Sequence, residues 1–240
     1  LADLSHNYKP ITARYVPYSV GLIASYAIKK FGDSVEVKIF KWPDKLAKAL
    51  KEESCDILGV PTYAWNTALA HWACKIGKKY NPNLLTVLGG PHLPKHYDQK
   101  LEYFKENKDV DIRVLLEGEL AFANIIKTVL EKGIGNRDKI FSAKIGGCVY
   151  LNKEKDKLVE SFINRIDALD SIPSPYTTGI LDEFLDGTLG ILIQTNRGCP
   201  YACTFCQEGN NYYSRVNYHS LDYVKKELDY IGERVNPVVS

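Results

Sequence analysis

Residues 56–76, DILGVPTYAWNTALAHWACKI, contain the pattern that decides the fold. The stretch begins with a nearly continuous apolar run, Asp56–Pro61, which is typical of a parallel strand buried on both faces. After a short polar turn, apolar residues recur at helical spacing from Leu69 to Ile76, and Asn66 stands at the N-cap position. The stretch therefore predicts one βα unit.

Four more units of this kind surround the first. Apolar runs predict further strands at Leu1–Leu4, Val35–Phe40, Leu84–Gly89 and Ile112–Leu116. Amphipathic helix patterns lie between these runs, and the last of them ends at Gly133. Five βα units favour an α/β fold, a Rossmann-like five-stranded parallel sheet with helices on both faces. Ligands of such sheets lie outside the carboxyl ends of the strands.

The chain after Gly133 has a different pattern. Cys148–Leu151 and Leu158–Val159 flank a charged turn and predict a β-hairpin, and prolines then mark a polar connector. Gly190–Thr195 reads as a new strand and Leu221–Ile231 as a new helix. One βα unit cannot bury both of its own faces, so we expect a truncated second domain. The expected divisions are a domain of residues 1–139, a hairpin and linker over 140–186, and the start of a second domain over 187–240.

The composition is that of a globular protein. The 240 residues are 45% apolar and 25% charged, and the net charge is +2. So small a charge gives no reason to expect nucleic acid or an anionic membrane as a partner. No apolar run approaches the roughly 18 residues that span a bilayer. The sequence contains no Met, so we expect a piece of a longer protein.

Three of the six cysteines lie within one short segment, Cys199-Pro-Tyr-Ala-Cys203-Thr-Phe-Cys206, in the loop between the last predicted strand and helix. Such crowding does not resemble a disulfide framework, so a reducing, cytoplasmic location is expected. Three thiolates suit zinc or an iron–sulfur cluster. A structural zinc ion needs a fourth ligand, for which His219 is the nearest candidate. A cubane cluster with three cysteine ligands would keep one iron open, and the spacing favours it.

The segment resembles the signature of the radical S-adenosylmethionine (radical SAM) superfamily. That signature is C-x3-C-x2-C with an aromatic residue before the last cysteine, matched by Cys199, Cys203, Phe205 and Cys206. The resemblance implies a [4Fe–4S] cluster in the loop after the first strand of a partial TIM-type (β/α)6 barrel. It also implies that S-adenosylmethionine binds the open iron, that Phe205 lies near the adenine, and that a 5′-deoxyadenosyl radical forms. No catalytic residue beyond the cluster ligands is expected.

The amino-terminal half resembles the cobalamin-binding domain that precedes many radical SAM barrels. Three motifs at consecutive predicted strand ends carry this resemblance, and it implies that they contact cobalamin. They are Thr62, Tyr63, Trp65 and Asn66; Gly89, Gly90, Pro91 and His92; and Glu117, Gly118 and Glu119. Leu116 stands where the family usually has another glycine. The nucleotide tail of the cofactor is expected near Gly89-Gly90, because adjacent glycines admit close backbone approach.

Each of these motifs has an ordinary alternative. A Gly-Gly pair commonly makes a βα turn, and Trp65 is also a candidate core residue. Glu117 and Glu119 also suit a helix N-terminus, where the dipole favours acids. Their joint occurrence favours cobalamin. The D-x-H-x-x-G motif that supplies a cobalt ligand in other cobalamin domains is absent, so no protein histidine is expected below the cobalt.

The resemblance implies methyl transfer to an unactivated carbon or phosphorus centre. One alternative is a cobalamin-associated radical cyclase or rearrangement enzyme that uses the same cofactors. Another is a non-catalytic cobalamin-binding module with a structural metal site. The expected partners are a small-molecule substrate and an electron donor, with neither nucleic acid nor membrane.

Overall fold

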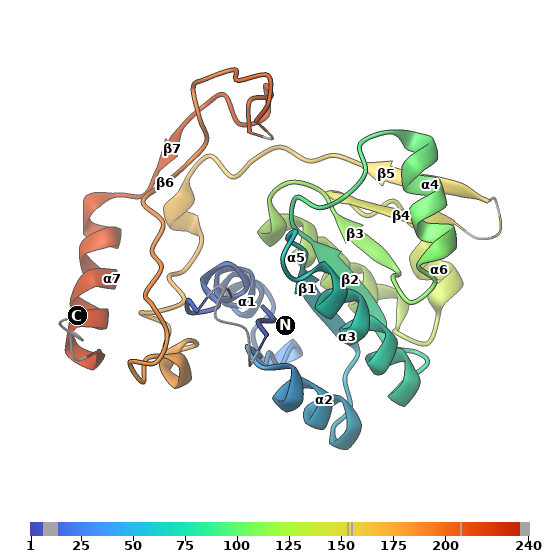
Figure 1. Cartoon of the computed structure of the whole chain (residues 1–240), viewed down its shortest axis with the longest axis horizontal. Helices are drawn as coiled ribbons and strands as arrows, with labels where there is room; N and C mark the ends of the chain where they lie inside the picture. The colour runs from blue at the N-terminus through green and yellow to red at the C-terminus, as the bar shows by residue number, and fades with distance from the viewer. Residues whose placement is uncertain (7–13, 153, 155, 207, 236–240) are drawn as a thin grey trace. The chain divides into compact units, whose positions relative to one another are not determined.

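The computed structural model describes residues 1–6, 14–152, 154, 156–206 and 208–235 (Figure 1). The chain forms two compact units, Leu1–Ala13 with Glu36–Ile163, and Arg14–Val35 with Asn164–Ser240. These bounds differ from those of the predicted domains. Within the described ranges, no helix has the length and apolar character needed to cross a membrane.

The first unit is built on one five-stranded sheet. In spatial order its strands are β1 (Ile57–Pro61), β2 (Leu85–Gly89), β3 (Ile112–Val114), β4 (Cys148–Asn152) and β5 (Lys157–Ser161). The first three strands are parallel, whereas β4 and β5 run antiparallel to their neighbours. The predicted α/β class is confirmed, but the prediction of a wholly parallel sheet is wrong because this sheet is mixed.

Two of the predicted strands do not form as such. Leu1–Leu4 and Val35–Phe40 share one isolated parallel bridge, between Ala2 and Phe40, and the Ala2 amide donates to the Gly59 carbonyl at 2.9 Å. The side chains of residues 35–38 are exposed or half-buried. Because this segment is not buried on both faces, it lacks the packing that holds a central parallel strand.

The predicted hairpin forms, as β4 and β5, but it belongs to the sheet rather than to a linker. Val149 pairs with Arg113 and Cys148 with Val114, so β4 continues the sheet beyond β3. Cys148, Val149 and Tyr150 are all fully buried. A strand with successive buried residues needs cover on both faces. Pairing with the edge of β3 places β4 in contact with helices of the first unit.

Helices cover both faces of the sheet. On one face, α2 (Pro43–Glu52), α3 (Thr67–Tyr80) and α4 (Tyr97–Glu106) share a single apolar cluster with the strands. On the other face lies α5 (Gly118–Lys132), whose Phe122 packs against Gly59. The short helix α6 (Arg137–Ser142) was not predicted. This sandwich leaves the carboxyl ends of β1, β2 and β3 together at one edge (Figure 1).

The second unit contains two long helices and a two-stranded ribbon. Its elements are α1 (Tyr18–Phe31), α7 (Leu221–Arg234), β6 (Asn196–Arg197), β7 (Asn217–Tyr218) and three short 3-10 helices, η1 (Gly32–Ser34), η2 (Leu169–Ser171) and η3 (Asp182–Phe184). The predicted strand at Gly190–Thr195 is wrong. Among the described residues it makes one isolated bridge, from Gly190 to Tyr15, and Leu192 stays 45% exposed, because no neighbouring strand lies beside it.

Candidate functional site

The loop after β1 is fastened to the end of β2 by Thr62. This residue is fully buried, and both its amide and its hydroxyl donate to the Gly89 carbonyl, at 2.8 and 2.7 Å. The side chain is therefore occupied within the protein. Its first contribution is to hold the two loops together.

Asn66 shapes the same loop from inside. It stands at the N-cap position of α3, as predicted, but its Oδ1 accepts from the Tyr63 amide at 2.7 Å rather than from the helix. Its Nδ2 donates to the carbonyls of Pro61 at 3.1 Å and Leu4 at 3.5 Å. Because Asn66 is only 1% exposed, its amide determines the course of the loop.

The remaining side chains of this loop face outward. The Tyr63 and Trp65 rings stack with centroids 4.7 Å apart and an interplanar angle of 2°. Trp65 is 59% exposed, which excludes the alternative that it is a core residue. The exposed Trp65 ring, backed by the half-buried Tyr63, offers a flat stacking surface to a large ligand at the carboxyl edge of the sheet.

The two glycines after β2 differ in what constrains them. Gly90 has a φ of +82°, and a Cβ there would lie 2.5 Å from the Thr62 carbonyl oxygen. Glycine is thus required at position 90 by the backbone conformation and by contact with the Thr62 carbonyl, and not by a ligand. A Cβ on Gly89 would meet only Val114 Cβ, at 3.9 Å. Open space for a ligand is therefore found at Gly89, followed by the exposed residues Pro91 and His92.

The third motif forms the junction of β3 with α5. Leu116 has a φ of +61°, a conformation that costs a non-glycine residue about 1–2 kcal/mol. This explains why the family pattern has glycine at that position. Glu117 occupies the N-cap position, Gly118 is the first residue of α5, and Glu119 is buried in its first turn. The position of Glu119 fits the helix-dipole alternative.

Sequence reasoning missed Arg113, which lies below these loops. Its side chain is fully buried, and its Nη2 donates to the His92 carbonyl at 2.9 Å. Its Cζ lies 5.6 Å from the centre of the Tyr103 ring, and the Tyr103 hydroxyl lies 3.2 Å from His71 Nε2. Burial lowers the pKa of Arg113, and it also lowers that of His71. The available signal was a charged residue inside the apolar run Ile112–Leu116.

The cysteine loop follows β6 and leads back through β7. Cys199 and Cys203 are half-buried, Cys206 is exposed, and all three are free thiols. The loop is held by its backbone, since the Cys199 amide donates to the Tyr213 carbonyl at 2.8 Å and the Cys206 amide to the Cys203 carbonyl at 3.1 Å. Among the described residues, no three His, Cys, Asp or Glu side chains converge closely enough to hold a metal ion.

The side chains around the cysteines fall into two kinds. Phe205 is 91% exposed, so its ring is available to a ligand. His219, in contrast, is buried, with Nδ1 2.9 Å from Asp170 Oδ1 and its ring stacked on Tyr223 at 4.0 Å. These contacts hold the imidazole in the body of the second unit. The zinc alternative therefore loses the fourth ligand that it required.

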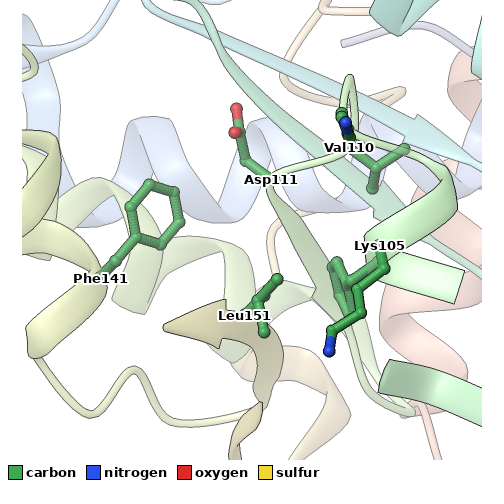
Figure 2. Close-up of a pocket in the computed structure, with 7 residues that line it drawn as sticks. Lys105, Val110, Asp111, Phe141 and Leu151 are labelled. Carbon is green, nitrogen blue, oxygen red and sulfur yellow. The ribbon is translucent and has the colours of Figure 1, made fainter. Parts of the chain in front are cut away.

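A cavity of about 570 Å³ lies elsewhere in the first unit (Figure 2). Lys105, Val110, Asp111, Phe141 and Leu151 are among the residues that line it. Asp111 immediately precedes β3, so the cavity opens at the amino ends of the strands, away from the predicted loops. Two of its polar groups are already engaged, Asp111 with Lys78 and Arg137, and Lys105 with Asp156 at 2.9 Å.

Comparison with known proteins shows related sequences over most of the chain. The cobalamin-dependent radical SAM methyltransferase TokK of Streptomyces tokunonensis is 28% identical over 230 residues, which cover 91% of this chain and 32% of that protein. The anaerobic magnesium-protoporphyrin IX monomethyl ester cyclase of Cereibacter sphaeroides is 28% identical over 243 residues, 98% of this chain and 36% of that protein. No family model matches the chain.

Among solved structures, the cobalamin-dependent radical SAM enzyme OxsB, with aqua-cobalamin and S-adenosylmethionine bound, shares the fold. The TM-score is 0.70 at 17% identity, over 97% of this chain and 31% of OxsB. This chain spans about a third of the length of the curated relatives that it matches. By sequence and by fold, the chain is thus a relative of the cobalamin-dependent radical SAM enzymes. It corresponds to about a third of the length of TokK and of OxsB.

Proposed function

We propose that the chain is the cofactor-binding part of a radical SAM enzyme that uses a [4Fe–4S] cluster, S-adenosylmethionine and cobalamin to methylate an unactivated carbon or phosphorus centre. The observation that carries this proposal is the loop with three free thiols at the C-x3-C-x2-C spacing, in a chain related to TokK over 91% of its length. When bound, the cluster supplies the electron that cleaves the sulfonium, and cobalamin carries the methyl group.

The donor set of the cysteine loop fits an iron–sulfur cluster. Three thiols, none of them in a disulfide, are soft ligands that suit iron and leave one iron of a cubane open. Cys199, Cys203 and Cys206 would bind the irons. The exposed ring of Phe205 would pack on the adenine of S-adenosylmethionine and exclude water from it.

The edge of the first unit fits cobalamin in three ways. Trp65 is exposed and stacks on Tyr63, and Gly89 has room beside it. Below the loop, Arg113 has two buried nitrogen atoms that find no hydrogen-bond partner among the described residues. We assign Tyr63, Trp65, Gly89, Pro91, His92, Glu117 and Gly118 to ligand contact. Thr62, Asn66, Gly90 and Glu119 act through the loops that they hold in place.

The partners and location follow from the same proposal. The enzyme would act on a small molecule, take electrons from a reducing protein and work in the cytoplasm, where thiols stay reduced. Neither nucleic acid nor membrane is expected as a partner, because the net charge of +2 provides no strong field.

A cyclase is the second candidate, favoured by the related magnesium-protoporphyrin ester cyclase, which matches 98% of the chain. The two are separated by incubating the full-length, reconstituted protein with S-adenosylmethionine, reductant and candidate substrates. Equimolar 5′-deoxyadenosine and S-adenosylhomocysteine would mark methyl transfer, and 5′-deoxyadenosine alone would mark cyclisation or rearrangement. If S-adenosylmethionine is not cleaved, the chain belongs to a non-catalytic cobalamin-binding module.

A further inference from the structure

Arg113 enters the apolar layer between the sheet and its helices. Its register neighbours are Leu88 on β2 and Val149 on β4. Both belong to the apolar cluster that lies beneath α3 and α4. The Arg113 side chain therefore points toward those helices, and none of it is exposed to solvent.

A cation in such a place normally has an acidic partner, because removing a charge from water costs several kcal/mol. Two other buried cations of this unit obey the rule, since Lys41 pairs with Asp3 at 3.2 Å and Lys100 pairs with Glu160. Arg113 does not. Within the described part of the chain its Nε and Nη1 have no hydrogen-bond partner, and it makes no salt bridge. Two buried donors therefore remain for a ligand.

The groups around the guanidinium also suit an anion. His71 on α3 and Tyr103 on α4 are half-buried, and His92 above them is exposed. The charges that act on His71 come from Arg113 and His92, and both lower its pKa, as burial does. The surroundings of Arg113 are thus basic, and two of its neighbours, His71 and Tyr103, are partly exposed to solvent.

We infer that Arg113, Tyr103 and His71 form a phosphate seat, and that its occupant is the phosphodiester in the nucleotide tail of cobalamin. This rests on the proposed function, which brings that tail to the turn at Gly89-Gly90. The phosphodiester carries one negative charge and two free oxygens. A guanidinium donates to such a group through charge-assisted hydrogen bonds, and the Tyr103 hydroxyl can donate one more.

The test compares two corrinoids on the full-length protein. Cyanocobalamin has the nucleotide tail, and dicyanocobinamide lacks it. In absorbance titrations, Arg113→Met should weaken cyanocobalamin binding about 10- to 100-fold and change dicyanocobinamide binding less than about twofold. Tyr103→Phe should weaken only cyanocobalamin binding, by about threefold. Lys100→Gln removes a buried cation that already has a partner, so it should leave the preference between the two corrinoids unchanged.

Thermal unfolding of each variant separates binding from folding. Arg113→Met should keep or raise the melting temperature, because an apolar side chain replaces an uncompensated charge. Equal weakening of both corrinoids, or unchanged binding of cyanocobalamin, would overturn the phosphate seat. If Arg113→Met does not fold, Arg113 is structural, and Tyr103→Phe then decides whether any seat exists. If inorganic phosphate alone raises the melting temperature of the wild-type protein but not that of Arg113→Met, the seat binds free phosphate instead. A wild-type protein that binds neither corrinoid contradicts the proposed function itself.

Discussion

The loops after β1 and β2 and the loop of Cys199–Cys206 are both expected to bind a cofactor, yet they are built in different ways. In the first, Thr62 and Asn66 are buried and bonded to the chain itself. In the second, backbone hydrogen bonds hold the loop, while its three thiols are free and Phe205 is exposed. A sequence motif can therefore mix residues that build a loop with residues that meet a ligand, and substitutions distinguish the two.

The largest effect is expected at the cysteines. Replacing Cys199, Cys203 or Cys206 with Ala should each abolish the proposed cluster, because each change removes one of its three proposed ligands. Iron and acid-labile sulfide are measured after anaerobic reconstitution. Cys55→Ala is the matched control and should keep the full iron content, since burial raises the pKa of the Cys55 thiol and keeps it protonated. Zinc without iron in the wild-type protein would contradict this prediction.

The two glycines after β2 should separate folding from binding. Gly90→Ala should lower the free energy of unfolding by about 2–4 kcal/mol, from its positive φ and the clash with the Thr62 carbonyl. Gly89→Ala should change it by less than about 0.5 kcal/mol and still weaken cobalamin binding. Urea denaturation and absorbance titration measure the two quantities. Normal cobalamin binding by Gly89→Ala would place the ligand elsewhere.

Asn66 should behave as a structural residue. Asn66→Ala removes the acceptor of the Tyr63 amide and should lower the free energy of unfolding by about 2 kcal/mol. Urea denaturation measures this, with the exposed Gln99→Ala on α4 as a control that should be neutral. A neutral Asn66→Ala that loses cobalamin would instead make Asn66 a ligand contact.

Trp65 should show the opposite behaviour. Trp65→Ala should leave the free energy of unfolding within about 0.5 kcal/mol and weaken cobalamin binding about tenfold, because the ring is exposed and stacks on Tyr63. Tyr80→Ala, another exposed aromatic at the end of α3, is the control and should bind normally. Loss of stability without loss of binding would assign Trp65 to the loop.

The smallest effect is expected at Glu227 on α7, a buried residue that is hydrogen-bonded to Tyr18 of α1 within the second unit. Burial raises its pKa above the ordinary 4.5, and its carboxyl accepts from the Tyr18 hydroxyl at 3.3 Å. Because the pKa of Glu227 is higher in the folded state than in the unfolded state, the folded protein binds the proton more tightly. The free energy of unfolding therefore falls as the pH rises from the unfolded-state pKa through the folded-state pKa. Glu227→Gln should make the free energy of unfolding depend less on pH over this range. Urea denaturation from pH 4 upward checks it, and parallel curves for both proteins would refute it.

Much of the first unit could be predicted from local pattern. Apolar spacing correctly predicted three strands and the helices that follow them. These strands were predicted at Asp56–Pro61, Leu84–Gly89 and Ile112–Leu116. The periodicity of apolar residues could not show which strands pair with each other, however. It predicted the hairpin at Cys148–Val159 but could not show that β4 would join β3, because pairing depends on which edge is open in space.

In the second unit, pattern was less informative. The helix at Leu221–Ile231 formed, but Leu221 is 89% exposed and Glu227 is buried. The apolar stripe predicts which face can be buried, whereas the neighbours decide which face is buried. Tyr18 of α1 packs near Glu227 and gives that carboxyl a hydrogen-bond partner.

The three thiols of the cysteine loop and their spacing could be read from the sequence alone, because they are local properties of eight adjacent residues. The sequence also placed Leu116 where the family pattern has glycine, but the positive φ of that residue came from the structure. The structure was needed to show that Thr62 and Asn66 are buried and form hydrogen bonds within the protein, whereas Trp65 is exposed. It alone placed Arg113 beside His71, Tyr103 and His92, since those residues come from three separate elements and a loop. Hydrogen bonding and desolvation depend on neighbours in space, and residues far apart in the sequence supply them.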